Sequence, residues 1–285
     1  MATPNHGSWG CYPCIIAPVH SGNWSVHPLA ARLLRPLRLA AGRFAIDPVT
    51  EQLVWRFNDQ MRQQDLRSSL FYKAAKLIAS DEIEGDYLEF GVYLGGSFST
   101  AYHAIGCAFD EASSPGPWNT ERECQVRRAI GDRMRFFAFD SFEGLPASDG
   151  TSKDFVEGKF SASERTFLGN IAANGVDLGR ARTVPGFFSA QLLEDARIRH
   201  RIEHASIVHI DSDLYESAKI VLDFLPSVLG DCAVLIFNDW FSYRGDPRFG
   251  EQRAFAEWRH EHPECLVTPY HTEGPWSMSF IVNRA

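Results

Sequence analysis

The chain has 285 residues and a formal net charge of −8, with 45% hydrophobic and 22% charged residues. This composition is ordinary for a globular protein with a full core, and the acidic balance argues against broad binding of nucleic acid. No run approaches the ~18 apolar residues of a membrane span, and the start lacks the basic and apolar regions of a secretory signal. We therefore expect a soluble, cytoplasmic protein with no membrane or nucleic-acid partner.

The six cysteines do not have the pattern of a disulfide framework. Cys107 and Cys232 fall in apolar runs, which predicts core thiols and a reducing compartment. Cys11 and Cys14 form a single C-x-x-C, and without a second pair this is a weak indication of zinc or redox chemistry.

Three segments are expected along the chain. Residues 1–27 are rich in Gly, Pro, Ser and His, which indicates a flexible N-terminal arm. Residues 28–80 show helical periodicity and predict an N-terminal helical cap. Such helices cover a ligand cleft, form a dimer contact or pack on the edge of a sheet, and the sequence leaves these roles open. Residues 81–285 are expected to form the main domain.

The main domain begins with a strand, a glycine turn and a helix over residues 86–97. This order is typical of nucleotide-binding α/β domains. Tyr93 stands where a dinucleotide fingerprint has a glycine, and Glu89 at the strand end would repel a diphosphate. A cationic nucleoside without phosphate, S-adenosylmethionine, suits this turn better. An NAD(P)-dependent oxidoreductase is the alternative, and Tyr93 argues against it.

The rest of the chain alternates between strands and helices, which predicts a Rossmann-like, doubly wound α/β sheet. We expect seven strands, mostly parallel, with an antiparallel C-terminal hairpin and additional N-terminal helices. The elements predicted after the first unit are an insertion over 110–130, a strand over 135–139, a helix over 161–173, a strand over 181–188, a short helix over 191–199, strands over 205–210 and 232–237, and two terminal strands over 265–270 and 276–282.

Acidic residues follow four of the predicted strands. They are Glu89, Asp140, Asp211 and the pair Asn238-Asp239. Because ligands of open α/β sheets bind at the carboxyl ends of the strands, we expect these side chains to line one site. Like charges crowded together need a cation to offset them, and a sulfonium cofactor or a divalent metal would supply it.

Asp140 is a candidate ribose clamp, since a carboxylate can accept hydrogen bonds from both ribose hydroxyls. Capping of the following turn is the alternative. Glu89 either holds the amino end of the cofactor or orders the glycine turn.

Asp211, Asn238 and Asp239 form an oxygen-only set that suits Mg²⁺. A metal there would bind substrate oxygens and lower the pKa of a hydroxyl; without metal, the set would be an acid network that orients the substrate. Asp213 is predicted to cap a helix that begins at Leu214.

Two histidines and two aromatic residues complete the candidates. His209 lies inside a predicted strand and is expected in the core, whereas His271, expected in the last loop, is a candidate general base. Trp240 and Phe241 either form a wall of the acceptor pocket or pack in the interior.

Four motifs resemble the macrocin O-methyltransferase family, the TylF/MycF-type group of class I S-adenosylmethionine-dependent methyltransferases. They are Glu89–Ser97, Asp140–Pro146, Gly186–Phe188 and His209–Ser217, within residues 70–285. The resemblance implies an S-adenosylmethionine-dependent methyltransferase domain that acts on a hydroxyl of a sugar or other small natural product in secondary metabolism. It also implies Mg²⁺ near the acceptor and a homo-oligomer.

The resemblance and the residue patterns together give the predicted site. The catalytic candidates are Asp211, Asp239 and His271, the metal ligands are Asp211, Asn238 and Asp239, and the cofactor-binding residues are Glu89, Phe90, Gly91, Tyr93, Gly95, Ser97, Asp140, Ser141 and Phe142. The chain departs from the family at Asn238, where an Asp-Asp pair is usual, and in the 110–130 insertion and the N-terminal arm. Asn238 leaves open a non-catalytic partner that keeps the fold and the cofactor site.

Overall fold

The computed structural model describes residues 64–147 and 155–284. The expected arm at 1–27, with Cys11 and Cys14, and most of the expected cap at 28–80 lie outside these residues. From Leu70 onward the described chain belongs to one compact unit, which begins with helix α3 (Leu70–Ser80). None of the described helices has the length and apolar character needed to cross a membrane.

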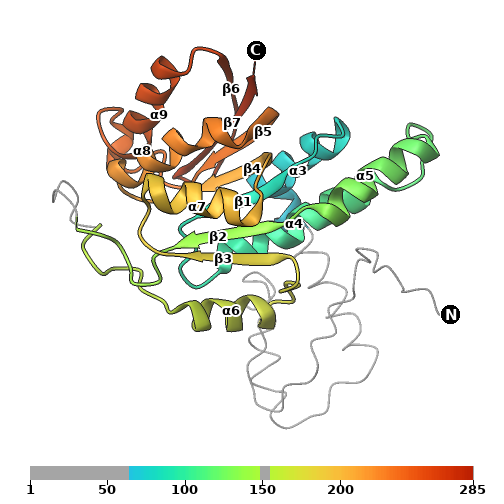
Figure 1. Cartoon of the computed structure of the whole chain (residues 1–285). Helices are drawn as coiled ribbons and strands as arrows, with labels where there is room; N and C mark the ends of the chain where they lie inside the picture. Colours follow the sequence, from blue (N-terminus) through green and yellow to red (C-terminus); the bar gives the residue numbers. More distant parts are fainter. Residues whose placement is uncertain (1–63, 148–154, 285) are drawn as a thin grey trace, which may run out of the picture. The chain divides into compact units, whose positions relative to one another are not determined.

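A seven-stranded sheet forms the centre of this unit (Figure 1). The strand order is β3-β2-β1-β4-β5-β7-β6; the first five strands are parallel, and β7 runs antiparallel to both β5 and β6. The predicted doubly wound sheet with a C-terminal hairpin is confirmed. The strands are β1 (Asp86–Phe90), β2 (Phe136–Asp140), β3 (Ala181–Pro185), β4 (Ala205–Ile210), β5 (Leu229–Phe237), β6 (Cys265–Glu273) and β7 (Ser277–Arg284).

Helices cover both faces of the sheet. Successive side chains of a strand point to opposite faces. On β1, Tyr87 packs on Phe71 of α3 and Phe98 of α4, whereas Phe90 packs on Phe224 of α8. The helices that follow α3 are α4 (Gly96–Ala112), α5 (Glu121–Arg133), α6 (Glu164–Ala173), α7 (Ala190–His200), α8 (Tyr215–Phe224) and α9 (Gly250–Glu261), with short 3-10 turns η1 (Leu225–Ser227) and η2 (Tyr243–Gly245).

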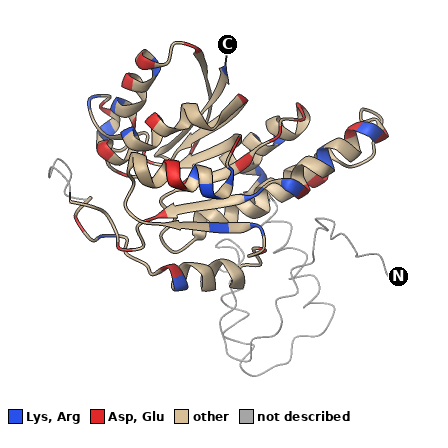
Figure 2. Ribbon diagram, viewed as in Figure 1, with Lys and Arg blue, Asp and Glu red and all other residues tan. Residues whose placement is uncertain are grey.

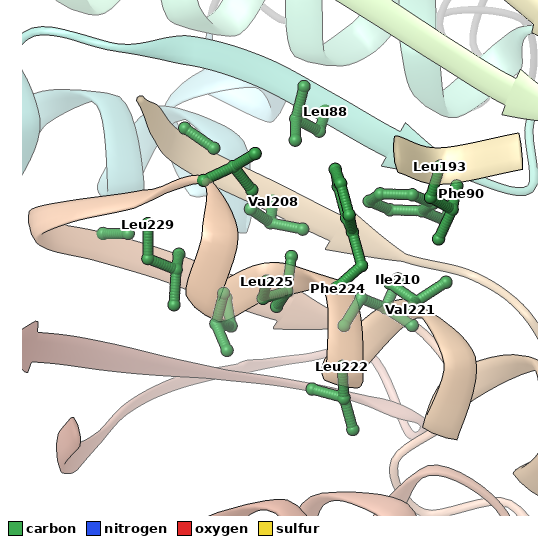
Figure 3. Close-up of a cluster of buried hydrophobic side chains, with 14 of the residues drawn as sticks. Leu88, Phe90, Leu193, Val208, Ile210, Val221, Leu222, Phe224, Leu225 and Leu229 are labelled. Atoms are coloured by element: carbon green, nitrogen blue, oxygen red, sulfur yellow. The ribbon is translucent and has the colours of Figure 1, made fainter. Parts of the chain in front are cut away.

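A large hydrophobic core lies between the sheet and helices α7, α8 and α9. Figure 3 shows Val221 and Phe224 of α8 and Leu225 of η1 close to apolar side chains of β1 and β4. Figure 2 shows a similar division by charge: the central strands are mostly uncharged, whereas α5, α7 and α9 carry both acidic and basic residues. The buried sheet therefore fixes the positions of the strand ends that carry the predicted acids.

Two predicted elements differ from the structure. The 110–130 insertion is largely helical: α4 continues to Ala112, and α5 begins after Thr120, whose side chain forms a capping box with Glu123. Asp213 does not cap a helix, because α8 begins only at Tyr215 and has Leu214 as its N-cap. Asp213 instead has a φ of 58°, in the left-handed region.

The cysteine prediction was wrong in its choice of residues. Cys107 and Cys232 are only half-buried, whereas Cys124 and Cys265 are buried. The Cys107 thiol lies near Glu111 one helical turn later, and Cys232 lies in the less buried first half of β5. An apolar run in sequence therefore did not mean full burial at these two positions.

Candidate active site

A glycine turn connects β1 to α4 at the carboxyl end of β1. Gly91 has a φ of 91°, and a Cβ there would lie 2.0 Å from the backbone oxygen of Asp211. Gly95, the N-cap of α4, has a φ of 83°, and a Cβ there would lie 2.5 Å from Ile171. Both positions therefore need glycine, and the turn lies directly against the end of β4.

The end of β2 supplies the carboxylate that holds this turn. Asp140 Oδ2 accepts hydrogen bonds from the backbone N–H groups of Val92 (2.8 Å) and Tyr93 (3.0 Å). Its Oδ1 accepts a hydrogen bond from the N–H of Phe142 (2.7 Å). Asp140 thus fixes both the glycine turn and the turn that follows β2.

Glu89 points into the interior of the protein. It is fully buried and accepts hydrogen bonds from the hydroxyl groups of Tyr87 and Ser97, so it orders the first turn of α4. His209 Nδ1 lies 3.5 Å from Glu89 Oε1 but has no hydrogen-bond partner among the described residues. Burial lowers the pKa of His209, but the neighbouring Glu89 more than offsets this effect and raises it.

A cavity of about 500 Å³ lies at the carboxyl ends of β1, β2, β4 and β5. This is the place where open α/β sheets bind ligands. Its lining includes the glycine turn and the end of β2 (Gly91, Tyr93, Asp140, Ser141), the ends of β4 and β5 (Asp211, Ser212, Asp213, Asn238, Asp239) and four phenylalanines (Phe155, Phe160, Phe187, Phe188).

Three carboxylates meet on the β4–β5 side of the cavity. One oxygen of each of Asp211, Asp213 and Asp239 lies within 4.8 Å of the others. Burial and the other carboxylates raise the pKa of Asp211 to about 7 and that of Asp213 to about 9. We call these three residues the acid cluster.

Two further residues border the acid cluster. Asn238 Nδ2 donates a hydrogen bond to Asp211 Oδ1 (3.1 Å), while the hydroxyl of Ser277 donates to Asn238 Oδ1 (3.4 Å). Glu251 of α9 is buried behind the cluster and accepts a hydrogen bond from the backbone N–H of Asp239 (3.0 Å). Burial and the charges of Asp239, Asp211 and Asp213 raise the pKa of Glu251 well above its ordinary value.

Comparison with known protein families bears directly on this site. Residues 124–263 match the model of the Macrocin-O-methyltransferase (TylF) family. This segment, just under half of the chain, is similar to the TylF family. It carries three of the four motifs on which the predicted resemblance depends, and the prediction of an S-adenosylmethionine-dependent O-methyltransferase is confirmed. The oxidoreductase alternative is thereby ruled out.

Two solved structures show the same fold. The O-methyltransferase NovP has a TM-score of 0.53 and 18% identity, with 79% of each chain covered. CalS11, a calicheamicin methyltransferase, has a TM-score of 0.55 and 20% identity, with 93% of this chain and 98% of that chain covered. No curated protein sequence matches the chain.

The structure divides the predicted cofactor residues into two groups. Gly91, Tyr93, Asp140 and Ser141 line the cavity. The others support it from behind or flank it, and they are Glu89, Phe90, Gly95, Ser97 and Phe142. Phe90, for example, is fully buried and stacks on Phe139.

The predicted catalytic and metal residues also divide. Asp211, Asn238 and Asp239 all line the cavity. His271 does not, and the prediction that it lies in a loop was wrong, because β6 continues past a bulge to Glu273 and includes it. Trp240 packs against Phe237 and Phe280, which fits the packing role considered for it.

Three kinds of functional residue were missed from the sequence. Asp213 was interpreted as a helix cap, although its spacing of two from Asp211 was visible. Glu251 looks like an ordinary acidic residue in the first turn of a helix, and only the fold shows that it is buried behind Asp239. The phenylalanines of the cavity come from separate segments; for Phe187 and Phe188 the Gly-Phe-Phe motif was the available signal.

Proposed function

We propose that this protein transfers a methyl group from S-adenosylmethionine to a hydroxyl of a small natural product, such as a sugar moiety, with Mg²⁺ at the acid cluster. The observation that carries the proposal is that one cavity joins the glycine turn to the acid cluster. A methyl donor at the first and an acceptor oxygen at the second would lie in the same enclosed space.

The β1–β2 end of the cavity suits the cofactor. Each carboxylate oxygen can accept more than one hydrogen bond, so Asp140 can accept from ribose hydroxyls while it holds the glycine turn. Tyr93 and Ser141 border the same space. When bound, S-adenosylmethionine supplies an electrophilic methyl carbon on a positively charged sulfur, and the nearby carboxylates favour that charge.

The β4–β5 end suits a small dication. Mg²⁺ prefers oxygen ligands and is commonly held by one or two carboxylates with additional waters. The raised pKa values of Asp211 and Asp213 support this assignment, because a cation would stabilise their ionised forms. Asp211 and Asp239 would hold the metal, joined by Asn238 if its amide turns to present the oxygen. When bound, Mg²⁺ lowers the pKa of an acceptor hydroxyl.

Asp213 is the best-placed residue to take the proton of that hydroxyl. It lines the cavity, and burial and the neighbouring carboxylates raise its pKa to about 9. A general base works best when its pKa is near the operating pH, and a cation bound beside Asp213 would lower its pKa toward that range and leave it ionised. We therefore assign the base to Asp213 in place of His271, which lies outside the cavity lining.

The acceptor site is bordered by aromatic side chains. Phe160 and Phe187 line the cavity and remain 39% and 46% exposed. Exposed aromatic rings at a cavity are suited to bind apolar faces of a ligand. They favour an acceptor that carries both a hydroxyl group and an apolar surface, as glycosylated natural products do. The homo-oligomer, the place in secondary metabolism and the cytoplasmic location stay predictions.

Two measurements test the proposal. Calorimetry should show binding of S-adenosylmethionine, and absence of binding would contradict the cofactor assignment. Mass spectrometry of reactions with a panel of sugars, phenols and hydroxylated natural products should show a product heavier by one CH₂. Addition of EDTA should suppress that product, and full activity in EDTA would contradict the metal.

A non-catalytic partner is the second candidate function. The side chain of Asn238 favours this function, because its NH₂ group faces Asp211 and an NH₂ group cannot bind a metal ion. Such a protein would bind S-adenosylmethionine in the calorimeter but give no methylated product with any acceptor of the panel. The two measurements together therefore separate the two functions.

A further inference from the structure

Glu251 is a buried carboxyl group for which the proposed reaction has no direct use. It is 1% exposed and lies in the first turn of α9. Its Oε2 accepts a hydrogen bond from the backbone N–H of Asp239 (3.0 Å). Its Oε1 is buried and has no hydrogen-bond partner among the described residues. Among the described residues, this carboxyl group therefore accepts one hydrogen bond, and its donor is Asp239 of the acid cluster.

The first turn of α9 makes a second contact to the same backbone segment. Gln252 Nε2 donates a hydrogen bond to the backbone oxygen of Trp240 (2.6 Å). Two consecutive side chains of α9 thus hold two consecutive residues after β5. Asp239 also accepts a hydrogen bond from the hydroxyl of Ser242 (2.8 Å), so its side chain is fixed from the other direction.

The same region of the fold also holds Asp213. The hydroxyl of Tyr243 donates a hydrogen bond to the backbone oxygen of Asp213 (3.2 Å). The ring of Tyr243 packs directly on Gly250, where a Cβ would lie 2.7 Å from it. The start of α9 is therefore connected to two residues of the acid cluster, Asp239 through Glu251 and Asp213 through Tyr243.

Packing alone does not explain a carboxyl group at position 251. A buried carboxyl with an unpartnered oxygen costs free energy, and an apolar side chain would fill the space without that cost. Around metal sites, hydrogen bonds to the ligands fix their orientation, and loss of such a bond typically costs 10- to 100-fold in metal affinity. We infer that Glu251 is a positioning residue that holds the backbone of Asp239 so that its carboxylate can bind the cation.

This inference rests on the proposed metal site and adds to it a residue that does not touch the metal. The test compares the Mn²⁺ affinity of three variants of the full chain with that of the parent protein. Binding is measured from the electron paramagnetic resonance signal of the free Mn²⁺ ion. Glu251→Leu removes the acceptor, and Glu251→Gln keeps an oxygen that can accept from Asp239. Glu257→Gln is the matched control, because it removes a carboxylate from the same helix at a partly exposed position paired with Tyr215 and Arg253.

The inference predicts that Glu251→Leu weakens Mn²⁺ binding by about 10- to 100-fold. Glu251→Gln should stay within about threefold of the parent protein, and Glu257→Gln should not differ from it. S-adenosylmethionine affinity, measured by calorimetry, should be the same in all four proteins, which also shows that each variant is folded.

Other outcomes are also decisive. Unchanged Mn²⁺ affinity in Glu251→Leu would overturn the inference, as would an equal loss in Glu251→Gln. Equal loss of Mn²⁺ and S-adenosylmethionine binding would overturn it too, because Glu251 would then support the whole fold and not the metal site. If the parent protein itself binds no Mn²⁺, the proposed metal site is wrong, and this result is distinct from the others.

Discussion

The carboxylates at the β1–β2 end of the cavity have hydrogen-bond donors, whereas those at the β4–β5 end largely face one another. Asp140 accepts from three backbone N–H groups, and Glu89 accepts from two hydroxyls. Asp213 and Glu251, by contrast, are buried near other acids, and this raises the pKa of each. The carboxylates of the first end are held by hydrogen-bond donors, whereas at the second end the proposed cation would offset the crowded acids. The predictions below test this difference, beginning with the largest expected effect.

Replacement of the proton acceptor should affect catalysis and leave the cofactor end unchanged. We expect Asp213→Asn, which keeps the shape of the side chain, to lower kcat by about 10²- to 10⁴-fold, the usual contribution of a general base. S-adenosylmethionine affinity should not change. Steady-state kinetics with an identified acceptor, together with calorimetry, measure both. A kcat within threefold of the parent value would refute the assignment of Asp213 as the base.

Replacement of Asp140, the residue that holds the glycine turn, should weaken cofactor binding and leave metal binding unchanged. Asp140→Ala removes three hydrogen bonds that fix the cofactor end, so we expect S-adenosylmethionine to bind about 10- to 100-fold more weakly, the equivalent of about 1.4–2.8 kcal/mol. Mn²⁺ affinity should be unchanged. Asp177→Ala, which removes a similar backbone contact to Gly179, is the control. An equal loss of affinity for S-adenosylmethionine and Mn²⁺ would show that the two ends of the cavity do not bind their ligands independently.

The stability of the protein should depend on pH through the acid cluster. The pKa of Asp211 is raised from 3.8 to about 7 and that of Asp213 to about 9, so the folded protein binds more protons than the unfolded chain in this range. Without metal, the free energy of unfolding should therefore fall as the pH rises from about 4 to 9. Because Mg²⁺ competes with these protons, it should stabilise the protein more at pH 8 than at pH 5, by at most about 1.4 kcal/mol at tenfold excess over the Kd at pH 8.

Thermal unfolding with and without Mg²⁺ at the two pH values measures this effect. Ca²⁺ at the same concentration controls for selectivity, and NaCl at matched ionic strength controls for screening. A Mg²⁺ effect that is equal at both pH values would mean that the metal binds away from Asp211 and Asp213.

The smallest effect is expected at the start of α4. Ser97→Ala removes one of the two donors to the buried Glu89, and we expect a loss of about 1–2 kcal/mol in the free energy of unfolding. The affinity for Mn²⁺ should stay the same. Urea unfolding followed by circular dichroism is the measurement, and Thr100→Ala, on the exposed side of the same helix turn, is the control. An equal loss of unfolding free energy in both variants would show that the hydrogen bond to Glu89 contributes no more to stability than the bond made by Thr100.

The strands that position the site could be predicted from the sequence, because their physical signal is local. The second half of β5 is a continuous apolar run, as expected for a parallel strand buried on both faces, and β4 is rich in apolar residues and buried along its whole length. Helix α5 could not be predicted in the same way, because few of its residues are buried and its sequence is mostly charged. Its capping box at Thr120 and Glu123 was the usable signal.

The residues that meet in and around the acid cluster depend on backbone conformation and on contacts between distant segments, which a sequence pattern does not contain. Asp213 follows a strand and precedes an apolar helix, which is the usual position of a helix cap. Its φ is positive, however, and the N-cap of α8 is Leu214. Glu251 lies 12 positions after Asp239, and only the packing of α9 beside β5 brings them together. The ends of strands were thus predictable individually, whereas contacts between distant segments required the fold.

The most direct test of the two-ended cavity is a crystal structure of the full chain with S-adenosylhomocysteine and Mn²⁺. Our account predicts an anomalous Mn²⁺ peak between the carboxylates of Asp211 and Asp239, with the ribose of the cofactor product at Asp140. A Mn²⁺ peak elsewhere, or an acid cluster that binds no metal at saturating Mn²⁺, would contradict it.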